Sequence, residues 1–298
     1  SGFIGSNLVK SLVEEGSLVT VISRDPLAVD KNLYSLDNVQ MIQGSLDQTD
    51  FIKLIEDIDC RIIIHLVSNL IPSSNQHDYG IEERRVINPT HKIIELCSKK
   101  NIKFIYFSSG GMLYGKDATN INESQQLLPF NYYGESKYRI EEKIKEYSSL
   151  RDLDSIILRP SNIYGRLHNL NKDQGFIERL IDNITKEKKM VIWGSGKQMR
   201  DFLYVDDLIL VIIELIKVDF KQSSVNVANG NSHSLLEIIK ICENILNKKA
   251  MIEFKDKRGI DSENIGFDIS LLKETISFLP DDIEKGLRKY IKRLTVNE

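Results

Sequence analysis

The chain has 298 residues, enough for one large domain or two smaller ones with a hydrophobic core. Its 40 Lys and Arg residues and 43 Asp and Glu residues give a net charge of −3, which argues against nucleic acid or an anionic membrane as a partner. The longest apolar stretch, 208–216, is too short to span a bilayer. Three widely separated cysteines indicate neither a disulfide framework nor a metal site, and they favour a cytoplasmic protein.

The first sixteen residues, SGFIGSNLVKSLVEEG, indicate a phosphate-binding turn. Gly2 and Gly5 have the spacing of a loop that lets the backbone approach a pyrophosphate. Residues 7–15 have the apolar period of a helix that ends at Gly16, and its N-terminus would supply N–H donors. A strand, LVTVIS, follows after one short turn. This order predicts a nucleotide-binding unit.

The predicted strand at 18–23 ends in Ser23-Arg24, where an NAD site is expected to place an acidic residue. The guanidinium of Arg24 could instead pair with the 2′-phosphate of NADP. Alternatively, Arg24 is a solvated surface residue, and Asp25 or backbone groups serve the ribose. The sequence leaves both interpretations open.

Further strands are predicted at 61–68, 101–109 and 154–160, alternating with helices at 82–99 and 133–147. Their continuous apolar runs indicate strands buried on both faces, as in a doubly wound parallel sheet of the Rossmann type. After Gly165 the alternation ends, which predicts a smaller, discontinuous α/β substrate domain. We assign 1–165 and 203–229 to a dinucleotide-binding domain, and 166–202 and 230–298 to a substrate domain.

Tyr133 and Lys137 lie four residues apart on a predicted helix and therefore share one face. An ammonium group beside a phenol lowers the pKa of the phenol, so the pair could act as an acid/base unit. The alternative is an exposed helical pair with no chemical role. The segment FSSGGMLYG, directly after a predicted strand, makes this alternative weaker.

Several segments occur in the order found in one enzyme family: SGFIGSNLV, HLVS, FSSGGMLYG, YYGESK, LRPSNIYG, WGSGKQMRDFLYVDD and RGID. The chain resembles the extended short-chain dehydrogenases/reductases, and within them the nucleotide-sugar epimerases, the group of UDP-glucose 4-epimerase. In that family a strand and a further glycine precede the turn at Gly2. We therefore expect the natural protein to have roughly ten more N-terminal residues.

The resemblance implies a role for particular side chains. Tyr133 would be the catalytic acid/base and Lys137 its partner, which also holds the nicotinamide ribose. Besides these two and Ser23-Arg24, the implied cofactor-binding residues are Gly2, Phe3, Ile4, Gly5, Ser45, Leu46, Leu66, Val67 and Ser68. Ser45 stands where the family usually has aspartate. The implied substrate-binding residues are Ser108, Ser109, Asn162, Arg200, Arg258 and Asp261, the two arginines on a diphosphate and the aspartate at a ribose.

One position departs from the family pattern. The family usually places a Ser or Thr four residues before Tyr114, hydrogen-bonded to the reacting oxygen, and this chain has Gly110 there. Ser109 or Ser108 could substitute. Otherwise proton transfer relies on Tyr133 alone.

The resemblance favours a nucleotide-sugar 4-epimerase, acting on a UDP-hexose with bound NAD and without a metal. An NAD(P)H-dependent reductase or dehydrogenase on the same scaffold is the first alternative, and Ser23-Arg24 supports it because NADP suits a reductase. A non-catalytic dinucleotide-binding protein is the second. The family also implies a homodimer, formed through the helices at 82–99 and 133–147. Surface-polysaccharide synthesis is a plausible setting.

Overall fold

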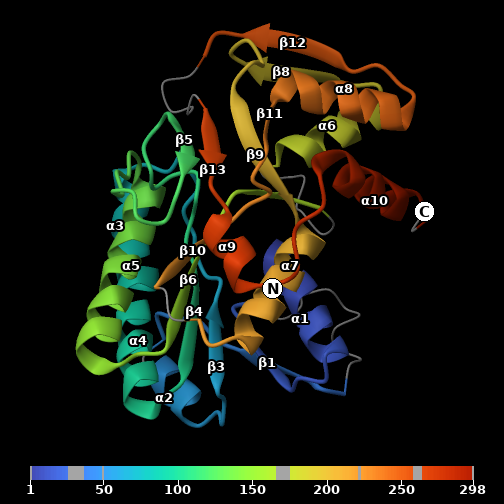
Figure 1. The fold of residues 1–298 in the computed structure, drawn as a ribbon. Helices are drawn as coiled ribbons and strands as arrows, with labels where there is room; N and C mark the ends of the chain where they lie inside the picture. The colour runs from blue at the N-terminus through green and yellow to red at the C-terminus, as the bar shows by residue number, and fades with distance from the viewer. Residues whose placement is uncertain are drawn as a thin grey trace. The chain divides into compact units, whose positions relative to one another are not determined.

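The structure is a computed structural model that describes residues 2–25, 37–48, 50–165, 175–220, 223–257 and 264–296. Contacts within the chain divide it into two units (Figure 1). Unit 1 contains Ser1–Leu113, Leu127–Arg159 and Asp219–Val225, and unit 2 contains Tyr114–Gln126, Pro160–Val218 and Asn226–Glu298. These boundaries differ from those of the predicted domains, whose assignment to cofactor and to substrate stays a prediction.

Unit 1 is built on parallel strands. Their bounds are β1 Val19–Ser23, β2 Val39–Gln43, β3 Ile62–His65, β4 Lys103–Phe107 and β6 Ser155–Pro160, with β10 Ser224–Val227 beginning in the same unit. β1 pairs with β2 in parallel, and β3, β4 and β6 are parallel neighbours in a sheet of order β10-β6-β4-β3. The predicted fold class is confirmed: the apolar runs form parallel strands, of which β4 and β6 are buried and β1 and β3 are half-buried.

The strands of unit 1 belong to two separate sheets. Among the described residues β1 pairs only with β2, and β3 pairs only with β4. The further strand expected ahead of Gly2 stays a prediction.

In unit 1, two α-helices joined by a π-helical turn form one continuous helical segment over 76–100. The bounds of the helices in this unit are α1 Phe3–Glu14, α2 Phe51–Glu56, α3 Gln76–Glu82, the π-helical turn η3 Glu83–Ile87, α4 Asn88–Lys100 and α5 Tyr132–Arg151. The helix predicted at 82–99 thus starts earlier, because Asn75 and Asp78 form a capping box with hydrogen bonds of 3.0 and 3.1 Å. α5 is also longer than the helix predicted at 133–147: it begins after the N-cap Asn131 and ends at Asp152, which has a left-handed conformation.

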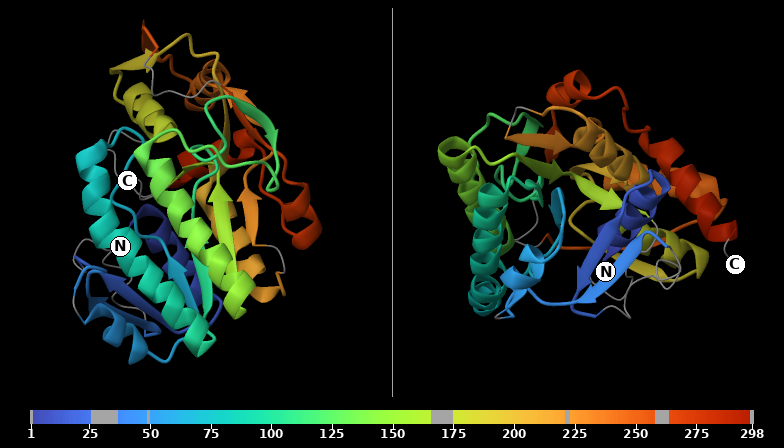
Figure 2. Two further views of the ribbon diagram at one scale, coloured as in Figure 1. Left: turned by 90° about the vertical axis from the view of Figure 1, so that its left-hand side faces the viewer. Right: turned by 90° about the horizontal axis from the view of Figure 1, so that it is seen from below.

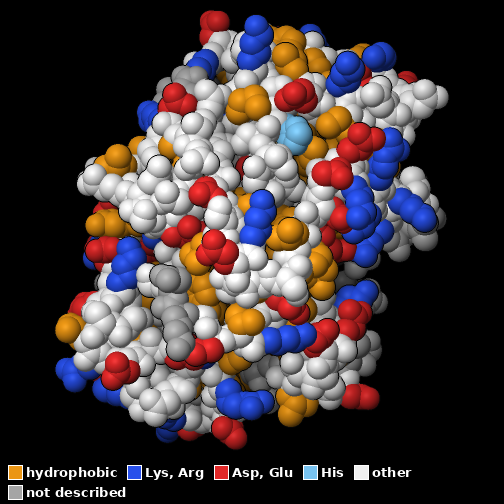
Figure 3. Space-filling view, in the orientation of Figure 1, with side chains coloured by type: hydrophobic (Ala, Val, Ile, Leu, Met, Phe, Trp, Pro, Cys, Tyr) orange, Lys and Arg blue, Asp and Glu red, His pale blue; other side chains and the backbone are white. Residues whose placement is uncertain are grey.

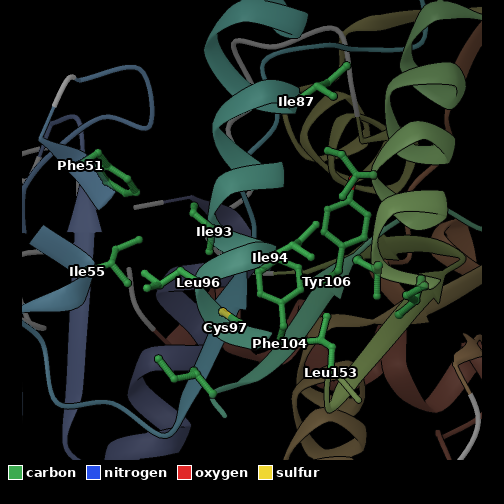
Figure 4. Close-up of a cluster of buried hydrophobic side chains, with 14 residues drawn as sticks. Phe51, Ile55, Ile87, Ile93, Ile94, Leu96, Cys97, Phe104, Tyr106 and Leu153 are labelled. Carbon is green, nitrogen blue, oxygen red and sulfur yellow. The ribbon is translucent and has the colours of Figure 1, made fainter. Parts of the chain in front are cut away.

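A hydrophobic cluster joins α4 to β4 in unit 1 (Figure 4). Ile94 and Cys97 of α4 are fully buried, as are Phe104 and Tyr106 of β4. α4 and α5 lie side by side over this sheet (Figures 1 and 2). The burial of these side chains holds β4 and its neighbour β3 in place. The residues that follow these two strands are the ones predicted to form the site.

Unit 2 is also an α/β structure. Its strands are β5 Ala118–Ile121, β7 Asn162–Tyr164, β8 Lys189–Trp193, β9 Met199–Tyr204, β11 Ser232–Ser234, β12 Met251–Lys255 and β13 Ile265–Phe267. They form sheets of order β11-β9-β7, β12-β8 and β13-β5. Its helices are α6 Phe176–Thr185, α7 Val205–Lys217, α8 Leu235–Leu246, α9 Ser270–Thr275 and α10 Ile283–Val296. The apolar stretch at 208–216 lies within α7 and is mostly buried.

Charges of both signs are interspersed over the face drawn in Figure 3, as the near-neutral composition predicts. Within the part of the chain that the structure describes, each helix is too short or too polar to cross a membrane.

Candidate active site

The N-terminus of α1 is open to an anion. Its N-cap, Gly2, has an extended conformation, and neither a side-chain cap nor an acidic residue occupies the first turn. A Cβ on Gly2 would meet nothing within 4 Å, whereas one on Gly5 would lie 3.4 Å from Cδ1 of Leu66. The glycine turn, with Phe3 and Ile4 in the first helical turn, therefore lies beside the residue that follows β3. Backbone N–H groups at such a helix end are suited to a pyrophosphate.

The end of β1 is shaped by a local turn. The Ser23 hydroxyl donates to the Asp25 carbonyl at 3.0 Å and accepts from the Asp25 N–H at 3.2 Å. Arg24 is exposed, and its carbonyl accepts from Gln43.

The predicted adenine-side residues Ser45 and Leu46 follow β2. The Ser45 hydroxyl donates to the Asp47 carboxylate, and this hydrogen bond lowers the pKa of Asp47. Arg85 Nε lies 3.2 Å from the same carboxylate. Asp47 is therefore held by two partners within unit 1, while Leu46 packs against the core cluster.

Tyr133 and Lys137 lie on the first turns of α5, whose N-terminus is fixed by the Asn131 side chain accepting from the Gly134 N–H at 2.8 Å. Lys137 Nζ donates to the Phe107 carbonyl at the end of β4, at 2.8 Å. The same nitrogen lies 5.6 Å from the centre of the Tyr133 ring and 5.1 Å from that of Tyr106. Lys137 is 4% exposed, so the alternative of an exposed helical pair is wrong for this residue.

Burial sets the pKa of both groups. It lowers the pKa of Lys137 to about 8, although Glu82 and Glu141 oppose this change. It raises the pKa of Tyr133 to about 12, and a hydrogen bond with the Ser109 side chain opposes the rise. A positive charge brought next to Tyr133 would lower the pKa of the phenol from this raised value.

The two serines before Gly110 have different partners. Ser108 is buried, and its hydroxyl donates to Glu141 Oε1 at 2.5 Å. Glu141 in turn accepts from Arg159 Nε at 3.1 Å and from Nη2 at 2.6 Å, in a fully buried ion pair. Ser108 is thus engaged in this network, whereas Ser109 faces the phenol of Tyr133.

Gly134 has a packing requirement next to Tyr133. A Cβ at this position would overlap the Met112 carbonyl oxygen, so the segment between β4 and β5 that carries Met112 would have to move. We expect Gly134→Ala to destabilise the protein by about 1–3 kcal/mol in denaturant unfolding. Gly111→Ala is the matched control, because a Cβ there meets nothing within 4 Å. Equal stability of the two variants would contradict this packing argument.

Two predicted substrate-binding residues lie on neighbouring strands of unit 2. Asn162 begins β7, and its side chain donates to the Asp201 carbonyl of β9 at 2.8 Å. Arg200 also belongs to β9, and its Nη1 donates to the Met199 carbonyl at 2.8 Å. Arg258 and Asp261 lie outside the described residues.

A parallel α/β fold with an uncapped, glycine-flanked helix N-terminus is typical of nucleotide-binding proteins. The sequence matches the NAD dependent epimerase/dehydratase family over residues 1–228. The chain belongs to this family, whose cofactor is NAD.

Relatives within the family differ in their reactions. The chain is 27% identical to the dTDP-4-dehydro-6-deoxyglucose reductase of Escherichia coli, with 99% of this chain and 95% of the relative covered. It is similar to the UDP-glucuronic acid 4-epimerase of Bacillus cereus in complex with UDP-glucuronic acid and NAD, at 26% identity and a TM-score of 0.85, with 98% and 97% of the chains covered. The UDP-glucose 4-epimerase of Thermotoga maritima shares the fold with a TM-score of 0.91 at 21% identity, and 99% and 96% of the chains are covered.

The residues present fit a dinucleotide. The helix end at Gly2 supplies backbone donors without a competing side-chain cap, and a methyl group there would fill open space. Gly2, Phe3, Ile4 and Gly5 would hold the pyrophosphate, and Lys137 would hold the nicotinamide ribose.

Three residues around Lys137 were not predicted from the sequence: Glu82, Glu141 and Arg159. Glu141 follows Lys137 by four residues on α5, and this spacing is a signal that could have indicated it. Glu82 and Arg159 come from other elements, and only the fold brings them close.

Proposed function

We propose that the chain is a nucleotide-sugar 4-epimerase that acts on a UDP-hexose. The observation that carries the proposal is the pair Tyr133–Lys137, which the Phe107 carbonyl holds at the end of β4. Membership of the epimerase/dehydratase family and the likeness to 4-epimerases support it.

Tyr133 removes the proton of the sugar 4-hydroxyl and later returns a proton to the same oxygen. NAD would supply a hydride acceptor that is regenerated in each turnover, and a positive charge. Lys137 stabilises the phenolate by its own charge, and Ser109 donates a hydrogen bond.

The proposed contacts to the nucleotide come from polar side chains in the second half of the chain. Asn162 would meet the sugar nucleotide, and Arg200 with Arg258 would bind the diphosphate. Asp261 would accept from a ribose hydroxyl. Two guanidinium groups suit a diphosphate because each can form paired, charge-assisted hydrogen bonds.

Substitution of Ser109 tests whether its hydroxyl replaces the one that the family usually has at the position of Gly110. We expect Ser109→Ala to lower kcat roughly 10- to 100-fold with little change in KM, because one hydrogen bond to the reacting group is lost. Ser109→Thr keeps the hydroxyl and should retain most of the activity. Full activity of Ser109→Ala in an epimerisation assay would show that Tyr133 works without it.

A reductase is the second candidate. Arg24 at the end of β1 and the E. coli reductase among the relatives favour it. Steady consumption of NADPH with a keto-sugar nucleotide, without epimerisation, would identify this activity. A non-catalytic dinucleotide-binding protein would show neither reaction.

We also propose a cytoplasmic homodimer. α4 and α5 lie side by side and would pack against the same pair of a second copy. A dimeric mass in light scattering is expected, and a monomeric mass would contradict the proposal.

A further inference from the structure

A buried carboxylate stands at the end of β3. Glu82, the last residue of α3, is 1% exposed. Its Oε1 and Oε2 accept from the Asn69 N–H at 3.3 and 3.2 Å, and Oε1 also accepts from the Ser68 hydroxyl at 3.4 Å. The side chain therefore holds the backbone that the resemblance places beside the cofactor.

The helical segment that contains Glu82 contacts the end of β3 at two places, through Glu82 and through Thr90. The π-helical turn η3 follows Glu82 directly, and such turns change which residues of a helix face the core. Beyond it, the Thr90 hydroxyl donates to the Val86 carbonyl at 2.6 Å and lies 3.0 Å from His65 Nε2. Because the Thr90 proton is used, His65 Nε2 is the donor in that contact. Glu82 and Thr90 thus hold both sides of the segment from His65 to Asn69.

The next residue shows that the burial of Glu82 is specific. Glu83 turns to the surface, where its carboxylate lies 2.5 Å from Arg139 Nη1. Its side chain is 41% exposed. The two glutamates are adjacent in sequence, and only Glu82 contacts the strand end.

The negative charge of Glu82 also raises the pKa of Lys137. The charged or titratable groups that face Lys137 are Tyr133 and Glu141 of α5, Tyr106 of β4, His65 of β3 and Glu82 of α3. Glu141 is neutralised by Arg159 at 2.6 Å, whereas Glu82 forms no ion pair with any residue that the structure describes. Both carboxylates favour the protonated form of Lys137, and the effect of Glu82 is the larger.

We propose that Glu82 is a positioning residue: it fixes Ser68 and Asn69 at the end of β3 against the cofactor. This inference concerns cofactor binding and is independent of the reaction. Only the pH profile described below rests on the proposed epimerase function.

The test compares Glu82→Gln with the matched control Glu83→Gln in the full chain. Glu82→Gln keeps the shape but loses the charge-assisted hydrogen bonds, so the Kd for NAD should rise roughly 10-fold or more. The variant should also show a smaller rise of Tm on NAD addition, because stabilisation by a ligand falls with its affinity. Glu83→Gln should match the wild type in both measurements.

The pH profile of kcat tests the charge. Lys137 is protonated below its pKa of about 8, so activity that needs the ammonium is lost as pH rises through that value. Removal of the Glu82 charge lowers the pKa of Lys137, so the alkaline limb should move to lower pH by roughly one unit. Glu82→Asp keeps the charge but shortens the reach. It should leave the limb in place and still weaken NAD binding.

A Glu82→Gln variant with wild-type Kd and pH profile would overturn the proposal. So would a variant with a lower Tm alone, since that would mean a structural role. If Glu82→Gln does not fold, Glu82→Asp decides the matter through its Kd for NAD, and an unchanged value overturns the proposal. Wild-type protein that binds NAD but epimerises no UDP-hexose would refute the proposed function, while the Kd comparison would still decide the role of Glu82.

Discussion

Tyr133→Phe is expected to lower kcat for epimerisation roughly 100- to 10,000-fold, because the variant loses the phenol oxygen that we propose moves the proton of the sugar hydroxyl. The ring remains, so its packing over Lys137 should be kept. The Kd for NAD should therefore change little. The measurement is a steady-state assay with UDP-hexose, together with NAD titration of the same preparation.

Tyr132→Phe is the control for this variant. Tyr132 precedes Tyr133 on α5, is 36% exposed, and has its ring 5.4 Å from that of Tyr79. Loss of its hydroxyl should leave kcat within about twofold, as expected for a group outside the reacting site. Unchanged turnover in Tyr133→Phe would instead mean that the catalytic assignment is wrong.

Loss of the Glu141–Arg159 ion pair is expected to have the largest effect on stability. Both side chains are almost fully buried, and Ser108 donates to the same carboxylate. Glu141→Gln leaves the Arg159 charge buried without its counter-ion, so the free energy of unfolding should fall by about 3–5 kcal/mol. Denaturant unfolding measures the change.

Two further variants sharpen this test. Glu146→Gln removes a carboxylate of α5 that is 50% exposed and lies 3.0 Å from Lys143, and it should cost less than about 1 kcal/mol. Glu141→Leu combined with Arg159→Met removes both charges and should recover part of the loss. A Glu141→Gln variant as stable as Glu146→Gln would contradict the account of the buried pair.

The strands β1, β3, β4 and β6 and the fold class could be predicted, because long apolar runs in alternation with helices allow few other arrangements. β2 and the strands of unit 2 were not predicted, since they lack such runs. The start of the helix at 82–99 could not, since it depends on a capping box between Asn75 and Asp78, in a segment without apolar periodicity. The π-helical turn at Glu83–Ile87 was also missed. It inserts a wider turn without any residue type that marks it.

In the candidate site, too, some features could be predicted from the sequence and others could not. Tyr133 and Lys137 are separated by one helical turn, so their sequence spacing was sufficient to group them. The surroundings of Lys137 were not predictable, because Glu82 and Arg159 lie far from it in sequence and depend on how α3 and β6 pack. From the sequence, either Ser108 or Ser109 could supply the hydroxyl that is missing at Gly110. The structure distinguishes them, because Ser108 donates to Glu141 whereas Ser109 forms a hydrogen bond with Tyr133.

The central claim is that this chain interconverts C4 epimers without consuming its cofactor. The most direct measurement incubates the NAD-loaded protein with UDP-glucose, UDP-galactose and their N-acetyl forms, and follows products by NMR and nicotinamide by absorbance. We expect interconversion of C4 epimers with no net change in nicotinamide absorbance. Steady loss of NADPH on a keto-sugar nucleotide, with no epimer formed from any UDP-hexose, would contradict it and identify a reductase.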